Sequence, residues 1–136
     1  MDESIKDWEL LNASPFADLI GPIHVRPAPE AVFRTVVGTM CANTMGRMHG
    51  GYVSALVDIC TGQGVKRIVG DGRSLVTLST HIDFLGSAAL GDTLEIVVGA
   101  DRVTRSVVFA SCVVSVGGEA VVRAAVVFSS RDKAAV

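Results

Sequence analysis

The sequence predicts an α+β domain in which an antiparallel sheet of five or six strands wraps around one long central helix. Residues 48–69 (MHGGYVSALVDICTGQGVKRIV) are apolar over most of a helix circumference, and the run is too long for an ordinary strand. After Gly72 the pattern changes to strict alternation, which is typical of half-buried strands. Runs of strands on either side of a single helix favour an α+β architecture.

The segments before the central helix are short. Residues 2–12 carry apolar side chains at helical spacing and predict a short N-terminal helix. A helical turn is expected over residues 16–20. Residues 23–26 and 31–38 form two expected strands, joined by a proline-stiffened turn.

The central helix is expected over about residues 50–69 and ends at the glycines around Asp71. The Gly117-Gly118 pair predicts a tight hairpin turn, because both positions accept positive φ. Four strands are expected after the helix, at residues 74–85, 93–100, 107–116 and 120–129. Without linkers or repeats, the whole chain 1–136 is expected to be one domain.

Composition excludes several classes of protein. A net charge of −2 gives no basic surface for nucleic acid. Asp58, Lys66 and Arg67 interrupt the only long apolar run, so no membrane span is expected, and the N-terminus does not resemble a secretory signal. The three scattered cysteines fit reduced thiols in the cytoplasm. The 49% hydrophobic content instead favours a large subunit interface.

Candidate chemistry lies in the central helix. His49-Gly50-Gly51 stands at the helix start, where free amides and the positive end of the dipole could hold an oxyanion. Asp58 is a carboxylate in an apolar helix, which is costly unless it is paired or used. It could activate water, attack a carbonyl itself, or simply bond Ser54 or Thr61 inside the core.

Residues Asn43-x5-His49-Gly50-Gly51-x6-Asp58, then Thr77, then the Phe84-Leu85 and Leu90-Gly91-Asp92 segments resemble the hot-dog-fold thioesterases of the phenylacetate-pathway (PaaI-like) family. The resemblance runs from about Phe16 to Phe128. It departs from the family pattern at Gly86-Ser87, where many members have proline after the first strand of the meander.

This resemblance implies an acyl-CoA thioesterase built as a homodimer or homotetramer, with no metal and no cofactor other than the CoA of its substrate. By position, Asp58 matches the catalytic carboxylate and Gly50 the amide that holds the thioester oxygen. Asn43 and His49 match loop residues around that oxygen, and Thr77 matches a helper hydroxyl.

Structural roles remain open for the same residues. His49 could bond a backbone carbonyl, and Asn43 could be an ordinary turn residue. Thr77 alternates out of phase with Leu78 and Ile82, so it could reach a site only at the strand end or at a bulge.

Further contacts to the substrate are expected from Gly51 and Thr61 on the helix. Arg102 and Arg105, with Lys66, Arg67 and Arg131 behind them, are candidates to hold the CoA phosphates, and solubilising surface charge is the alternative role for each. An acyl-thioester dehydratase or hydratase and a non-catalytic acyl-CoA-binding module are the alternative functions.

Helix geometry favours a shared site. Eight residues separate Gly50 from Asp58, which is about 12 Å along the axis. A reacting carbonyl must lie about 3 Å from its oxyanion donor and near the base, so one chain can hardly provide both groups. Two helices related by a two-fold axis could, and the sequence therefore predicts a homodimer with two equivalent shared sites.

Overall fold

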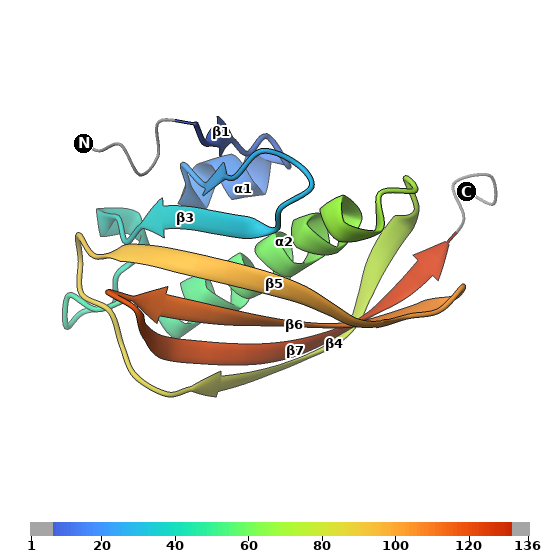
Figure 1. The fold of residues 1–136 in the computed structure, drawn as a ribbon. Coiled ribbons are helices and arrows are strands. Elements are labelled where there is room, and N and C mark those ends of the chain that lie inside the picture. The colour runs from blue at the N-terminus through green and yellow to red at the C-terminus, as the bar shows by residue number, and fades with distance from the viewer. Residues whose placement is uncertain (1–6, 132–136) are drawn as a thin grey trace.

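A computed structural model describes residues 7–131 and shows a long helix, α2 (Gly50–Val69), lying across the concave face of a curved sheet (Figure 1). The sheet has seven strands in the order β1-β2-β3-β5-β6-β7-β4, and all neighbouring strands are antiparallel. The strands are β1 (Glu9–Leu10), β2 (His24–Val25), β3 (Val32–Val36), β4 (Ser74–Phe84), β5 (Thr93–Val103), β6 (Val107–Val116) and β7 (Glu119–Arg131). The α+β prediction is confirmed, β2 lies within the strand expected over residues 23–26, and the one extra strand is the two-residue β1.

The central helix has the predicted bounds. His49 caps its N-terminus, and Gly70 ends it in the left-handed conformation at φ 71°. Gly117 and Gly118 both have positive φ, as the hairpin turn between β6 and β7 requires. The helical turn expected over residues 16–20 is α1 (Pro15–Ile20), capped by Ser14, and a 3-10 turn occupies Thr39–Cys41.

The helix predicted over residues 2–12 is wrong for residues 7–12. Residues 1–6 lie outside the described part of the chain. Glu9 and Leu10 pair with β2, and the Leu11 amide donates to the Ile23 carbonyl. The Trp8 ring lies about 5 Å from two guanidinium groups, those of Arg26 and Arg34. Strand pairing and cation–π contacts outweigh the weak helical preference of this segment.

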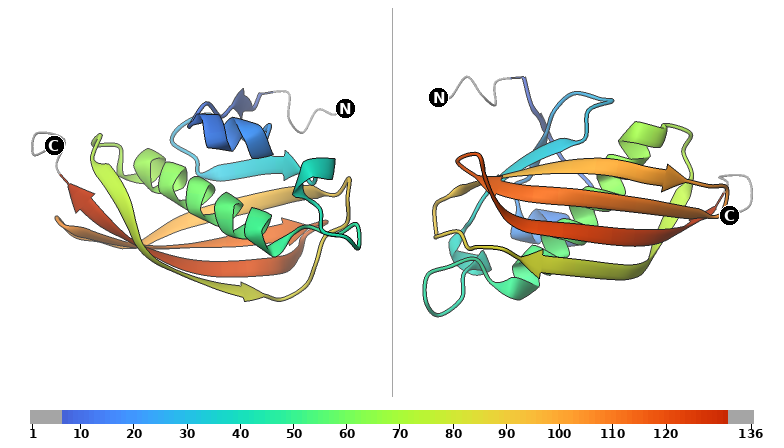
Figure 2. Two further views of the ribbon diagram at one scale, coloured as in Figure 1. Left: turned by 180° about the vertical axis from the view of Figure 1, so that it is seen from behind. Right: turned by 60° about the horizontal axis from the view of Figure 1, so that its bottom comes forward.

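The sheet covers only one side of α2, which is not enclosed all round as its apolar pattern suggested. The covered residues are Tyr52, Val53, Leu56, Val57, Cys60, Thr61, Gly64 and Val65. The opposite side, seen in front of the sheet in the left view of Figure 2, includes Ser54, Asp58 and Gly62 and is open in the single chain. This open face is where the candidate site lies.

A β-bulge in β4 changes which residues face the helix. The pairing of β4 with β7 shifts between Thr77 and Ser79, so Leu78 is the extra residue. Thr77 pairs with Phe128 and Thr80 with Val126, and both partners point to the core side. The bulge therefore places Thr77 on the same face as Thr80 and Ile82, which the strict alternation of the sequence does not.

Candidate functional site

The entrance to α2 presents free backbone donors. His49 is the N-cap, and its Nδ1 accepts a hydrogen bond from the Gly51 amide at 2.8 Å. Because Nδ1 is the acceptor, the ring proton is on Nε2, and the ring is exposed. Within residues 7–131, no hydrogen bond is made by the Gly50 amide, which lies in the exposed first turn. An exposed N–H at the positive end of a 20-residue helix is suited to holding an oxyanion.

Asn43 shapes the loop that leads to this entrance. Its Oδ1 accepts from the Met45 amide at 2.9 Å and from the Arg47 amide at 3.1 Å. Its own amide donates to the Arg47 carbonyl at 2.7 Å, and the His49 amide donates to the Cys41 carbonyl. Asn43 thus has the role of a turn residue, one of the roles that the sequence left open. The residue that carries its side-chain NH₂ group is exposed.

Asp58 lies half-buried on the open face of α2 and is held by β4. The Thr77 hydroxyl donates to Asp58 Oδ1 at 2.6 Å. Ser54 and Thr61 were the hydrogen-bond partners expected for Asp58 in a buried core, and neither bonds it. Ser54 donates to the Gly50 carbonyl instead, and Thr61 faces the sheet. The contact to Thr77 fixes one carboxylate oxygen and leaves Oδ2 directed away from that hydroxyl.

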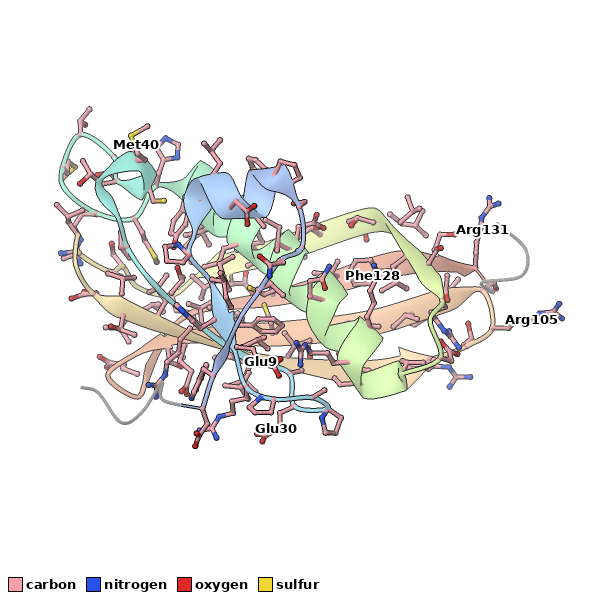
Figure 3. All side chains as sticks on the ribbon, turned by 90° about the horizontal axis from the view of Figure 1, so that it is seen from above. Glu9, Glu30, Met40, Arg105, Phe128 and Arg131 are labelled. Carbon is pink, nitrogen blue, oxygen red and sulfur yellow. The ribbon has the colours of Figure 1, made fainter. Side chains whose placement is uncertain are left out.

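Two separate recesses accompany these groups. One of about 340 Å³ lies beside the helix entrance, between α1, the 3-10 turn and the first turns of α2, and includes His49 and Gly51. The other, of about 180 Å³, lies between α2 and β4 and includes Asp58 and Thr77. In Figure 3, Met40 marks the entrance end of the helix and Phe128 lies farther along it. One chain therefore holds the carboxylate and the amide donors in different recesses.

Three of the expected substrate contacts lie elsewhere. Thr61 is fully buried on the sheet side of α2, close to the Cys112 thiol, so it cannot contact a ligand on the open face and that prediction is wrong. Arg102 ends up within β5 because the strand continues past the predicted turn, and Arg105 lies in the turn itself. Both are exposed, and Figure 3 shows Arg105 at the end of the molecule away from Met40.

The free edge of the sheet lies next to the site. β4 is the last strand in the order, and large apolar side chains are exposed along it, with Val76 and Leu78 60% exposed and Phe84 54% exposed. A long apolar edge strand calls for another strand to pair with it. Phe84 also approaches the helix entrance, because a Cβ built on Gly50 would lie 3.9 Å from its ring.

The cysteines do not offer a nucleophile. Cys41, Cys60 and Cys112 are buried free thiols. Burial raises the pKa of the Cys60 thiol well above its usual range, and the neighbouring Cys112 raises it further. In the described part of the chain, no group of three or more metal-ligating side chains is present. Asp58, half-buried on the open face, is a group that can act there as a base or a nucleophile.

The sequence did not indicate that Gly62, Gln63 and Lys66 line the recess beside Asp58. Their spacing of one and two helical turns after Asp58 is the signal that could have found them. Helical spacing could not have indicated Phe128, because only the pairing of β7 with β4 brings this residue to the recess beside Asp58.

A half-buried carboxylate and the free Gly50 amide thus lie on the open face of one helix, which is backed by a curved antiparallel sheet in the manner of a hot-dog fold. Residues 45–127 match the family model of the thioesterase superfamily, and the chain belongs to this superfamily. No described helix is long and apolar enough to cross a membrane.

Known proteins resemble the chain over most of its length. The PA0474 protein of Pseudomonas aeruginosa, provisionally assigned to the esterases, is 31% identical over 121 residues, which are 88% of this chain and 90% of that protein.

Among solved structures, a mutant of the phenylacetic acid degradation protein PaaI from Thermus thermophilus aligns with a TM-score of 0.75 at 22% identity, over 87% of this chain and 99% of that one. A hypothetical thioesterase of Streptococcus pneumoniae TIGR4, solved with coenzyme A, aligns with a TM-score of 0.69 at 23% identity, over 92% and 89%. These structures confirm the hot-dog fold, and with the family match they confirm the PaaI-like resemblance.

Proposed function

We propose that the protein is an acyl-CoA thioesterase that hydrolyses an acyl-CoA to the free acid and CoA at two sites shared between two subunits. The observation that carries this proposal is the 2.6 Å contact from Thr77 to Asp58, which holds a carboxylate on the open face of the same helix that presents the free Gly50 amide. The coenzyme A bound to the streptococcal neighbour supports the CoA part of the substrate.

In this proposal, the thioester carbonyl oxygen accepts a hydrogen bond from the Gly50 amide, with the Nε2–H of His49 beside it. Negative charge that develops on this oxygen is stabilised by the helix N-terminus. Asp58 Oδ2 either removes a proton from the attacking water or attacks the carbonyl carbon directly, in which case water then hydrolyses the mixed anhydride. Thr77 keeps the carboxylate oriented in both routes.

The geometry favours a site assembled from two chains. Gly50 and Asp58 are about 12 Å apart along α2, so a two-fold axis that brings one to the other must pass near Ser54, midway between them. β4 runs alongside this part of α2, because Phe84 lies near Gly50 and Thr77 is bonded to Asp58. The same axis would then cross the middle of β4 and join its free edge to that of the second subunit.

Other parts of the proposal follow from this arrangement. Arg102 and Arg105 are the exposed cations proposed for the CoA phosphates. The outer face of the sheet exposes Val97, Phe109 and Val113, which would serve a homotetramer made of two such dimers. The enzyme would need no metal or further cofactor and would act in the cytoplasm, where its buried thiols stay reduced.

The alternative functions have less support. A dehydratase or hydratase needs a histidine that exchanges protons, but the Nδ1 of His49 already accepts from the Gly51 amide. A binding module would not need a carboxylate that Thr77 holds at the side of a recess, because this carboxylate would repel the phosphates of acyl-CoA.

Complementation between two inactive variants tests the shared site. Asp58→Asn and Gly50→Val homodimers would each contain two broken sites. In a mixed dimer, one site would carry both changes and the other would be intact. Half of the dimers are mixed after equal refolding, so about a quarter of the wild-type activity should return.

The measurement is thiol release from acyl-CoA after the two variants are denatured together and refolded. Each variant refolded alone is the control, and subunit exchange is verified by native mass spectrometry. If mixed dimers form without any gain in activity, the shared-site arrangement is wrong.

A further inference from the structure

The recess beside Asp58 is open because residue 62 has no side chain. Gly62 lies one helical turn after Asp58, and a Cβ built there would lie 3.8 Å from the Phe128 ring, an ordinary contact. Its φ is not positive, so neither packing nor backbone conformation requires glycine at this position. The absence of a side chain instead leaves space beside Phe128, which lines the same recess and lies next to α2 in Figure 3.

The size of this recess fits the smaller part of an acyl-CoA. Its volume is about 180 Å³. A cavity of about 150 Å³ accepts a benzene ring, so this one can take an acyl group of roughly six to eight carbons. It is far too small for the pantetheine arm together with the nucleotide.

The lining changes from apolar to cationic along the recess. Ile59, Leu75 and Phe128 line it together with Asp58 and Thr77, and Gln63 and Lys66 line it farther along α2 toward the helix C-terminus. Within residues 7–131, no carboxylate lies in ion-pair range of the Lys66 ammonium. Lys66 follows Asp58 by eight residues, which is about 12 Å along the helix.

We propose that the acyl group lies over Gly62 and that the preferred substrates end in a carboxylate, which pairs with Lys66 and Gln63. The proposal rests on the thioesterase function above and names its substrate class as ω-carboxyacyl-CoA of about six to eight carbons. Asp58 repels the acidic end and Lys66 attracts it, so the charges orient the chain. Hydrolysis adds one water, breaks the carbon–sulfur bond and releases a dicarboxylic acid and the CoA thiol.

Charge explains why a simple fatty acyl group is a poorer fit. A hexanoyl chain would fill the apolar part and leave its methyl end beside Lys66 and Gln63, where it can pair with neither. Because Lys66 is exposed and water screens the pairing, the adipyl chain should have an advantage of several-fold in kcat/KM.

The test compares adipyl-CoA with hexanoyl-CoA in the wild-type protein, Lys66→Met and Lys66→Arg. Wild type should favour adipyl-CoA several-fold in kcat/KM. Lys66→Met should reduce this ratio to about one, because the methionine keeps the length and loses the charge. Lys66→Arg keeps the charge and should preserve most of the preference.

Four other outcomes would overturn the proposal. An equal loss with both substrates, together with weaker inhibition by free CoA, would assign Lys66 to a CoA phosphate. Unchanged kinetics with a lower Tm would make Lys66 only a partner of the helix C-terminus. If wild type hydrolyses hexanoyl-CoA without preferring adipyl-CoA, the substrate class is wrong and the thioesterase function stands. If no acyl-CoA releases thiol, both proposals fail.

Gly62→Ala gives an independent check on the path of the chain. The added methyl narrows the recess above Phe128, so kcat/KM for adipyl-CoA should fall several-fold relative to that for acetyl-CoA. An unchanged ratio would mean that the acyl group does not pass over residue 62.

Discussion

Two glycines in α2 should respond in opposite ways to the same substitution. A Cβ on Gly64 would lie 2.7 Å from both Cβ and Cγ1 of Val98 in β5, a distance that real Cβ atoms do not tolerate. A Cβ on Gly62 would make only an ordinary contact with the Phe128 ring. Gly64→Ala should therefore destabilise the fold, whereas Gly62→Ala should stabilise it.

The magnitudes follow from two terms. Both substitutions gain about 1 kcal/mol of helix propensity. Gly64→Ala also loses about 1–3 kcal/mol to overpacking, because the helix must move away from β5. The two variants should thus differ by about 1–3 kcal/mol, or roughly 3–10 °C in Tm for a chain of this length.

Thermal unfolding at one fixed protein concentration measures this difference, since association contributes to the apparent stability of an oligomer. A Gly64→Ala/Val98→Ala double variant adds a control, because the second change removes two of the three crowded atoms. Its stability should exceed the sum of the two single effects. If Gly64→Ala proved as stable as Gly62→Ala, the close approach of α2 to β5 would not depend on the glycine.

Four further substitution experiments address the site. Asp58→Asn should fold normally and lose about 10²–10⁴-fold in turnover, and wild-type turnover would make the carboxylate structural. Thr77→Val should lower kcat about tenfold with little change in KM, because the hydroxyl that holds Asp58 is lost. Thr77→Ser is the control, since it keeps the hydroxyl and its kcat should stay near that of wild type. His49→Asn keeps a capping oxygen and should retain the Tm while losing turnover, whereas His49→Ala should also cost about 1 kcal/mol of stability. Single cysteines placed from Thr80 to Ile82 should form intersubunit disulfides under mild oxidation, and a cysteine at Val97 on the outer face should not cross-link in the same dimer.

Local sequence patterns were enough to locate the central helix and the positions of the main strands along the chain, but not their order in the sheet. An apolar run closed by Gly70 has few alternatives to a helix, and its observed bounds, Gly50–Val69, are those expected. Strand positions followed from strict alternation for the same reason, since a period of two suits a half-buried strand. His49, Gly50 and Asp58 could be singled out because they interrupt this apolar pattern at one helix.

Which of these residues face one another depends on tertiary contacts. Thr77 reaches Asp58 only because the bulge at Leu78 reverses the faces of β4, and a bulge depends on how two strands pair rather than on one strand's residues. Thr61 was placed with Asp58 by helical spacing, yet the sheet lies against that side of α2 and buries it. The segment around Trp8 became a strand because β2 offered it hydrogen bonds. Local patterns fix the type of an element, but its contacts depend on the neighbours that only the folded chain supplies.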